Sequence, residues 1–365
     1  MTYSDIIQEN VNRYDPEWPK YAFHMTSISN FISILSCGYL YSRNYATSLN
    51  VLKTDNASQD VLGNTEDLVK DYVRFYFRPK TPTYYHWEGY HQKGVRYNNE
   101  TGVNISLPIL LLFDLESLLS DKQTMFNGIK ASGNIRNVNL KQGCQAFSEL
   151  KFEKIYHDGA TGLGGSIINY RHAEILYPHK YPISQSLKWI VCRNSSDVIT
   201  IKQLLREYDD TLLKKWQDKI KAKRRYFDFC GLRIEEKPIL AEHNTIQIGF
   251  ELLGQSAYEK YAKFVTRQSL LNRFPELDIM VEMSFDDKKC NYQYIINHHL
   301  ENPRVYLETI SIPIGSAKLN LKIYFDNKDE LVFCGSLKLK SRARKINLEF
   351  DCTGPELVFP KNERS

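Results

Sequence analysis

The sequence predicts an α+β protein in which a mixed helix and strand domain precedes an all-β domain. The chain has 365 residues, more than one typical hydrophobic core accommodates. Its N-terminal half alternates β-branched and aromatic runs with amphipathic segments. Its C-terminal third contains several runs in which apolar and polar residues alternate. Such runs at short spacing are typical of an antiparallel sandwich or barrel.

The first predicted strand and helix follow each other near the N-terminus. The aromatic run "YAFHM" predicts a strand over 21–25, and "SISNFISILSCG" predicts an amphipathic helix after it. The apolar residues at helical spacing are Ile28, Phe31, Ile32 and Leu35. Ser27 or Ser29 can cap the start of this helix, and Gly38 can end it.

Three further strands are predicted in the N-terminal half. "DYVRFYF" (71–77), "ILLLFDL" (109–115) and "LKWIVCR" (187–193) are rich in apolar and aromatic residues. The second is apolar on both faces, which predicts a central position in the sheet. Residues 41–70 lack strong periodicity and predict a long loop.

A connecting helix is predicted between the domains. Apolar residues recur on one helical face from 201 to 220, and the segment ends in the basic "KIKAKRR". The expected organisation is a first domain over 1–198, a basic connecting helix over 199–225, and a β-rich domain over 226–365. Alternation in that last domain is clearest in "KLNLKIYF" (318–325).

Composition favours a globular, cytoplasmic protein with no membrane association. The start lacks a basic stretch followed by an apolar one, and no apolar run approaches membrane-spanning length. Seven scattered cysteines without a C-x-x-C pair favour reduced thiols over disulfides or a zinc site. A net charge of +5 does not repel polyanions. The 24 Tyr and 18 Phe can stack on nucleic-acid bases, although most are expected in the core.

Common nucleotide-binding and hydrolase signatures are absent, including G-x-G-x-x-G after a strand, a Walker loop, H-E-x-x-H and G-x-S-x-G. Four other segments stand out. They are "FHMTSISNFISILSCGYLYSRN", "LVKDYVRFYFRPKTPTYY", "ILLLFDLESLL" followed by "TMFNGIKAS", and "INYRHAEILYPHKYPISQSLKWIVCR". In the first, His24 and Thr26 are two apart on an extended segment, so both can face one ligand. A structural role for a single histidine at a strand end is the alternative.

In this order, the segments resemble the DarT family of NAD-dependent ADP-ribosyltransferases, which modify bases of nucleic acid. The resemblance spans roughly residues 20–195 and rests on the family's motifs. They are H-x-T at His24 to Thr26, N-x-x-x-I-L-x-x-G at Asn30 to Gly38, D-Y-V-x-F-Y-F-x-P at Asp71 to Pro79, P-x-x-Y at Pro82 to Tyr85, an acidic strand end at Asp114, and R-x-A-E-x-L at Arg171 to Leu176. The resemblance implies an ADP-ribosyltransferase-like split β core with helices.

The resemblance also implies roles for single residues. Glu174 is the implied catalytic carboxylate, which would stabilise an oxocarbenium-like ribose and help to deprotonate the attacking base. The alternative is a surface ion pair between Glu174 and Arg171. The residues expected to bind NAD are His24, Thr26, Asn30, Gly38, Tyr72 and Tyr76. Phe75 and Phe77, on the same strand, are expected in the core.

The glycine-rich segment before Glu174 occupies the position where this family recognises its targets. Gly164 and Gly165 would let the loop close on a base, and Tyr170 and Arg171 could stack on or pair with a nucleotide. One departure concerns an arginine that the family carries ahead of D-Y-V. Residues 46–70 contain no Arg, so Arg43 or Lys53 is expected to replace it.

The leading functional hypothesis is a toxin of a toxin–antitoxin or phage-defence system that attaches ADP-ribose from NAD to a base of single-stranded DNA, without a metal. The same chemistry on RNA is one alternative, and an inactive module that binds NAD or nucleic acid is another. The resemblance implies an antitoxin, possibly a macrodomain hydrolase, or a chaperone as partner. We expect the C-terminal domain to bind the target, the antitoxin or the chaperone, and "KIKAKRRYF" could follow a phosphate backbone.

Overall fold

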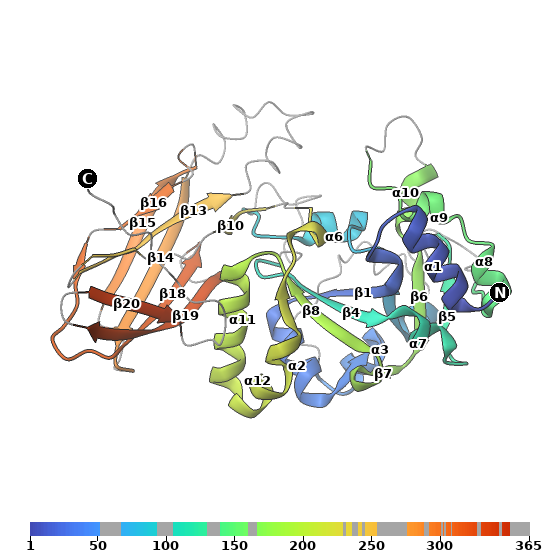
Figure 1. Ribbon diagram of the computed structural model, residues 1–365, viewed down its shortest axis with the longest axis horizontal. Helices are drawn as coiled ribbons and strands as arrows, with labels where there is room; N and C mark the ends of the chain where they lie inside the picture. Colours follow the sequence, from blue (N-terminus) through green and yellow to red (C-terminus); the bar gives the residue numbers. More distant parts are fainter. Residues whose placement is uncertain are drawn as a thin grey trace. The chain divides into compact units, whose positions relative to one another are not determined.

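The computed structural model describes residues 1–51, 67–92, 105–129, 139–159, 166–228, 231–235, 240–242, 245–253, 276–287, 292–300, 302, 304–307, 309–326, 330–342 and 345–350. The chain forms two compact units. The first unit comprises residues 1–193 and 218–230, and the second comprises 194–217 and 231–365. The first unit mixes helices with a central sheet and the second is mainly antiparallel strands, which confirms the predicted α+β fold class (Figure 1).

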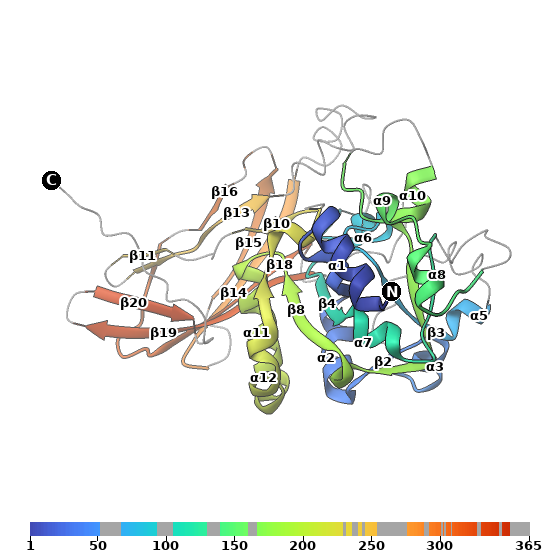
Figure 2. The same cartoon turned by 45° about the vertical axis from the view of Figure 1, so that its right-hand side comes forward.

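Seven strands of the described chain form one sheet in the first unit (Figures 1 and 2). In spatial order they are β5 (Met125–Asn127), β6 (Glu174–Pro178), β3 (Tyr72–Tyr76), β1 (Tyr21–Thr26), β4 (Ile109–Asp114), β8 (Leu187–Cys192) and β9 (Ile220–Ala222). Neighbours are antiparallel except β8 and β9, which are parallel. The predicted strands β1, β3, β4 and β8 are confirmed. The predicted interior position of β4 is also confirmed, because it pairs on both edges and is buried from Ile109 to Phe113.

The sheet opens between β1 and β3. β1 pairs with β4 along its whole length, but its register with β3 is limited to Phe23 opposite Tyr76. Side chains replace the missing ladder bonds at this point. The backbone N–H of Met25 donates to the phenol oxygen of Tyr84 (2.9 Å), and the imidazole of His24 bonds to the carbonyl of Arg74 (3.0 Å). These two side chains therefore satisfy backbone hydrogen-bonding groups where the strands do not pair continuously.

Short helices surround this sheet. They are α1 (Tyr3–Arg13), α2 (Ile28–Cys37), α3 (Arg43–Ser48), α5 (Asp67–Lys70), α6 (Pro82–Trp87), α7 (Leu115–Ser120), α8 (Cys144–Ser148), α9 (Phe152–Ile155) and α10 (Ser166–Arg171), with the 3₁₀ turns η1 (Trp18–Lys20), η4 (Ile183–Gln185), η5 (Gln217–Lys219) and η6 (Arg224–Tyr226). The predicted helix α2 is confirmed, since it buries Phe31 and Leu35 and ends at Gly38. A small ribbon pairs β2 (Tyr39–Tyr41) with β7 (Lys180–Pro182).

The prediction of one connecting helix over 199–225 is wrong. The segment forms α11 (Ser195–Tyr208) and α12 (Asp210–Trp216), and then the strand β9. Asp209 has an extended backbone and caps α12 by accepting from the N–H of Thr211, which separates the two helices. Ile220 pairs with Ile190 of β8, so "KIKA" completes the sheet instead of continuing the helix. The predicted domain boundary is therefore divided, because α11 and α12 belong to the second unit and β9 to the first.

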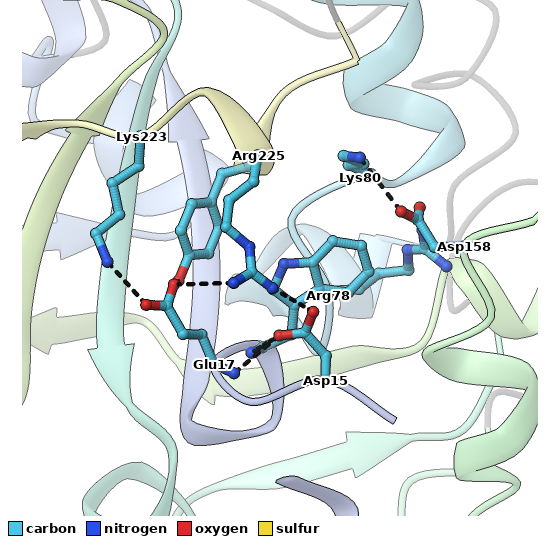
Figure 3. Close-up of polar contacts among 9 residues, drawn as sticks. Asp15, Glu17, Arg78, Lys80, Asp158, Lys223 and Arg225 are labelled. Carbon is cyan, nitrogen blue, oxygen red and sulfur yellow. Dashed lines mark hydrogen bonds and ion pairs between the residues drawn. The ribbon is translucent and has the colours of Figure 1, made fainter. Parts of the chain in front are cut away.

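The basic end of this segment forms ion pairs with the N-terminal region of the first unit (Figure 3). Glu17 accepts from Lys223 Nζ (3.0 Å) and from Tyr226 Oη (2.5 Å), and Asp15 pairs with Arg225. Tyr226 is fully buried. Two cations of "KIKAKRRYF" therefore hold the chain to its own unit, which weakens the hypothesis that this run follows a phosphate backbone.

In the described part of the second unit, strands form three antiparallel sheets. The largest has the order β15 (Tyr292–His299), β14 (Glu276–Phe285), β18 (Lys318–Phe325), β19 (Glu330–Arg342) and β20 (Lys345–Phe350). The smaller sheets are β10 (Arg233–Ile234), β13 (Gly249–Leu253) and β16 (Arg304–Tyr306), and β11 (Leu240–Glu242), β12 (Thr245–Gln247) and β17 (Ile310–Ser311). The alternation predicted for β18 is confirmed by its buried residues Leu319, Leu321, Ile323 and Phe325.

Two further features bear on the sequence predictions. Among the described cysteines, Cys37, Cys144, Cys192 and Cys334 are not in disulfide bonds. No helix in the described ranges combines the length and the apolar character needed to cross a membrane.

Candidate active site

The most enclosed charge in the first unit is the carboxylate of Glu174 at the start of β6. Glu174 has no exposed surface, and both of its oxygens bind the guanidinium of Arg74 on the neighbouring strand β3. Arg74 Nε lies 3.1 Å from Oε2, and Nη2 lies 2.5 Å from Oε1. Such a bidentate pair fixes the orientation of the carboxylate. The alternative of a surface ion pair with Arg171 is therefore wrong.

Two tyrosines extend the ion pair. Arg74 Nη2 also donates to Tyr76 Oη (3.3 Å), and the ring of Tyr76 packs edge-on against Tyr84 with centroids 5.0 Å apart. Burial raises the pKa of Tyr76 to about 12, so its phenol stays neutral. For Arg74, burial acts to lower the pKa, but the Glu174 carboxylate and nearby tyrosines raise it overall. Arg74 therefore remains a cation throughout the accessible pH range.

His24 is joined to this cluster through the backbone of β3. Its Nδ1–H donates to the Arg74 carbonyl, because a carbonyl oxygen can only accept. Burial lowers the pKa of His24, and the charge of Arg74 lowers it further against the opposing effect of that hydrogen bond. The neutral ring keeps Nε2 as an acceptor for a ligand hydroxyl. Thr26 follows on the same side of β1 and is buried, with Oγ1 3.5 Å from the carbonyl of Ser27.

The other residues expected to bind NAD lie on β3 and on or at the end of α2. Asn30 is on the first turn of α2, and Gly38 ends that helix in the left-handed conformation (φ +78°). Tyr76 lies opposite Glu174 in the register, whereas Tyr72 lies opposite Pro178, at the other end of β6. Tyr72 packs there against the buried pair Val69 and Leu176. Arg74 thus links Tyr76 to Glu174, whereas Tyr72 lies at the other end of the strand pair.

Tyr170 and Arg171, expected in the substrate loop, lie on α10 directly before β6. Figures 1 and 2 show α10 beside α9. The ring of Tyr170 lies 4.7 Å from Lys154 Nζ, and Arg171 Nη2 contacts His157 Nδ1 (2.8 Å) and the Gly159 carbonyl (2.5 Å). The other two loop residues, Gly164 and Gly165, lie outside the described residues.

A buried arginine holds the segment that leads to this loop. Arg78 donates to the carbonyls of Ile155 (3.1 Å) and His157 (2.5 Å). Arg78 and Lys80 both form ion pairs with Asp158 (Figure 3). The N···O distances are 3.0 Å for Arg78 and 3.3 Å for Lys80. Burial lowers the pKa of Arg78 to about 10, which still leaves it charged near neutral pH. Arg78 therefore fixes the backbone just ahead of the glycine-rich segment.

Of the two cations expected to replace the family's arginine, Arg43 is in the described part of the chain. Arg43 begins α3, which follows the ribbon strand β2, and Lys53 lies outside the described residues. Within the described ranges, no group of three or more His, Cys, Asp or Glu side chains has a geometry that could hold a metal ion. Asp114 caps α7 by accepting from Ser117 N (2.9 Å) and pairs with Lys188, so its role is structural.

With this geometry established, the chain was compared with known proteins. The family model described as "ssDNA thymidine ADP-ribosyltransferase, DarT" matches residues 23–227, more than half of the chain. The chain belongs to the DarT family. It is therefore an ADP-ribosyltransferase of the family that acts on single-stranded DNA. The match contains Glu174 and Arg74, and it also extends across α11 and α12 to the end of β9 and η6.

The solved structures similar to this chain include a DarT from Thermus sp. 2.9. Its complex with NAD+ is 16% identical and covers 57% of this chain and 98% of that chain, with a TM-score of 0.40. Its complex with ADP-ribosylated ssDNA is 15% identical and covers 57% and 96%, also with a TM-score of 0.40. No protein among the curated ones matches this chain.

Sequence reasoning missed Arg74 as the partner of Glu174. The residue fills the variable position of the D-Y-V-x-F motif, and its partner lies one hundred positions along the chain. A signal was present, since Arg74 is a single cation in the otherwise apolar and aromatic "YVRFYF". A charge at that position of a central strand requires a buried partner. Strand order was needed to show that the partner is Glu174.

Proposed function

We propose that this DarT family member transfers ADP-ribose from NAD to thymidine in single-stranded DNA, with Glu174 as the catalytic carboxylate. The observation that carries the proposal is a fully buried carboxylate, held in one orientation by Arg74 at the opening of the sheet. A preoriented negative charge is what an oxocarbenium-like ribose requires.

The reaction balances on these groups. The bond between the ribose C1 and the nicotinamide nitrogen breaks, and neutral nicotinamide leaves with the electron pair. In thymidine the remaining ring N–H is on the Watson–Crick edge, and this nitrogen or its conjugated oxygen forms the new bond to C1. Its proton passes to the Glu174 carboxylate and then to water. Arg74 holds the carboxylate during this sequence, and we assign to Arg74 the role for which Arg43 and Lys53 were considered.

The remaining site residues bind the two substrates in this proposal. His24 Nε2 accepts a hydrogen bond from a hydroxyl of NAD. Thr26, Asn30 and Tyr76 line the same opening between β1 and β3. Tyr170 and Arg171 contact the target nucleotide, together with Gly164 and Gly165. The contacts of α10 support this role because they hold Tyr170 beside the Lys154 ammonium and Arg171 beside His157. Gly38 and Tyr72 have structural contacts, which weakens their assignment to NAD.

The proposal extends to a toxin. An ADP-ribose on the Watson–Crick edge blocks base pairing, so uncontrolled activity would stop replication in the cytoplasm, where both substrates occur. A neutralising partner follows from this, either a macrodomain hydrolase that removes the modification or a chaperone. Expression in bacterial cells tests the toxin role: growth arrest by the intact chain and none by Glu174→Gln is expected, while normal growth with the active enzyme would contradict it.

The decisive experiment uses NAD labelled in its adenylate part. The purified chain is incubated with single-stranded DNA oligonucleotides with and without thymidine, and with RNA oligonucleotides of matched sequence. We expect label on thymidine-containing DNA, at least a hundredfold less with Glu174→Gln, and unchanged labelling with the exposed control Glu116→Gln. Label on RNA instead would replace the acceptor in the proposal, and intact NAD without labelled polymer would overturn the assignment of Glu174.

A further inference from the structure

A row of aromatic side chains lies on the ribbon strand β2, on α3 and just before β7. The rings of Tyr39 and Tyr41 are stacked, with centroids 6.0 Å apart and an interplanar angle of 21°. Tyr41 and Tyr45 follow at 5.5 Å, and Tyr45 and His179 at 6.5 Å. We call these four residues the tyrosine row.

The tyrosine row is accessible and carries positive charge. Its three tyrosines are partly exposed and His179 is exposed, whereas Tyr84 and Tyr181 in the core are almost completely buried. Lys180 is exposed and its Nζ lies 5.1 Å from the Tyr39 ring centroid. Accessible aromatic faces beside a cation are the elements that bind single-stranded nucleic acid.

The row is held in place by the backbone around His179. Ser42 N–H donates to the His179 carbonyl (2.7 Å), and His179 N–H donates to the Asp71 carbonyl (2.8 Å). His179 has a left-handed backbone (φ +56°), and Tyr41 pairs with Lys180 in the ribbon. The nearby Asp71 carboxylate accepts from Asn44 Nδ2 (2.9 Å). The rings are therefore positioned before any ligand arrives, which limits the entropy lost on binding.

We propose that the tyrosine row is a stacking platform for bases that flank the target thymidine in single-stranded DNA. This inference rests on the proposed function. Glu174 begins β6, and Pro178, next to His179, ends it. Four residues of strand span roughly 13 Å. A base on the row is thus a flanking base, and one DNA strand passes both the row and Glu174.

The test compares side chains that keep or remove the aromatic faces. The double variant Tyr39→Leu with Tyr45→Leu removes two faces and retains apolar bulk, whereas Tyr39→Phe with Tyr45→Phe keeps both. A matched control is Tyr3→Leu with Tyr14→Leu, two partly exposed tyrosines in and directly after α1 of the first unit. Affinity for a long thymidine-containing DNA strand is measured by fluorescence anisotropy without NAD, and the KM for NAD is measured separately.

We expect the Leu variant to bind the long strand at least tenfold more weakly, with the Phe variant and the Tyr3/Tyr14 control unchanged. A short oligonucleotide with little beyond the target thymidine should bind all variants alike. The inference would be overturned if the Leu variant and the unaltered chain bound the long strand equally well. It would also be overturned if the only effect were a higher KM for NAD, because the row would then bind the adenine of NAD. DNA affinity is measured without NAD, so no ADP-ribose is transferred. The test of the row is therefore independent of the test of the proposed reaction.

Discussion

At the scale of single residues, the pairing of Arg74 with Glu174 governs both stability and chemistry. Glu174 has no contact with solvent, so its charge is tolerated only because Arg74 replaces water on both oxygens. Removing one partner leaves a buried charge, whereas neutralising both leaves none. The contributions to stability and to catalysis can therefore be separated by mutation.

We predict that Arg74→Gln destabilises the first unit by about 3 kcal/mol, because the buried Glu174 carboxyl group loses its partner on both oxygens. The double variant Arg74→Gln with Glu174→Gln should recover most of this loss and remain inactive. Arg74→Lys should keep the charge but not the two-pronged contact, with an intermediate effect. Urea unfolding of the unaltered chain, Arg74→Gln, Glu174→Gln and the double variant measures the coupling. Equal stability of Arg74→Gln and the unaltered chain would show that the ion pair is open in solution.

A second prediction concerns His86 on α6. Burial lowers its pKa from 6.5 to about 4. Between these values the unfolded chain binds a proton at His86 and the folded chain does not, so stability falls as the pH decreases through this window. The partly buried His24, whose pKa is also lowered, acts in the same direction. Unfolding measured near pH 7 and near pH 5 should show a smaller loss for His86→Gln, and an unchanged loss for the exposed control His299→Gln.

At the scale of elements, Gly38 shows how a residue assigned to NAD can belong to a helix end. Its backbone N–H donates to the Ile34 carbonyl (2.9 Å) and its φ is +78°. We predict that Gly38→Ala costs about 1–2 kcal/mol through that conformation alone, because open space surrounds the position where a Cβ would stand. The exposed control Ser36→Ala, on the same helix, should cost less. An unchanged KM for NAD in Gly38→Ala would confirm the structural role, and a large rise would restore the assignment to NAD.

The elements that sequence reasoning placed correctly are those set by local pattern. β1, α2, β3, β4 and β18 each have a clear period or an apolar run, and the structure places them as expected. The failure at 199–225 has a physical cause. The apolar residue Ile220 fits a helical face equally well, but its pairing with Ile190, thirty positions earlier, decides for a strand. The same dependence on a distant partner explains why the sequence alone did not point to Arg74.

At the scale of the whole molecule, the chain leaves the first unit after β8 and returns to it at β9. These parallel strands require a crossover connection, and here α11 and α12 of the second unit provide it. α11 packs within the second unit, where the Cys334 N–H donates to Thr200 Oγ1 (3.1 Å). Ile201 and Leu205 on this helix are fully buried. Part of the second unit, residues 194–217, therefore lies in the sequence between the two segments of the first unit.

We predict that a chain ending after residue 230 is poorly soluble, because α11 then loses the strand β19 that it packs against. A chain that also replaces 194–217 with a flexible linker long enough for the crossover should be more soluble and keep the sheet. Soluble yield and thermal unfolding distinguish the two chains. With the second of them, our proposal that the β-rich unit binds the target, the antitoxin or a chaperone becomes testable: unchanged toxicity and neutralisation would refute it.

The crossover also sets the order of events on the ribosome. Synthesis proceeds from the N-terminus, so β8 emerges before both helices and before β9. Until residue 222 is available, the outer edge of β8 has no partner strand from this sheet, and an unpaired edge invites association between nascent chains. The buried Tyr226, which bonds to Glu17, arrives later still. Translation must therefore pass through part of the second unit before the enzyme's sheet is complete.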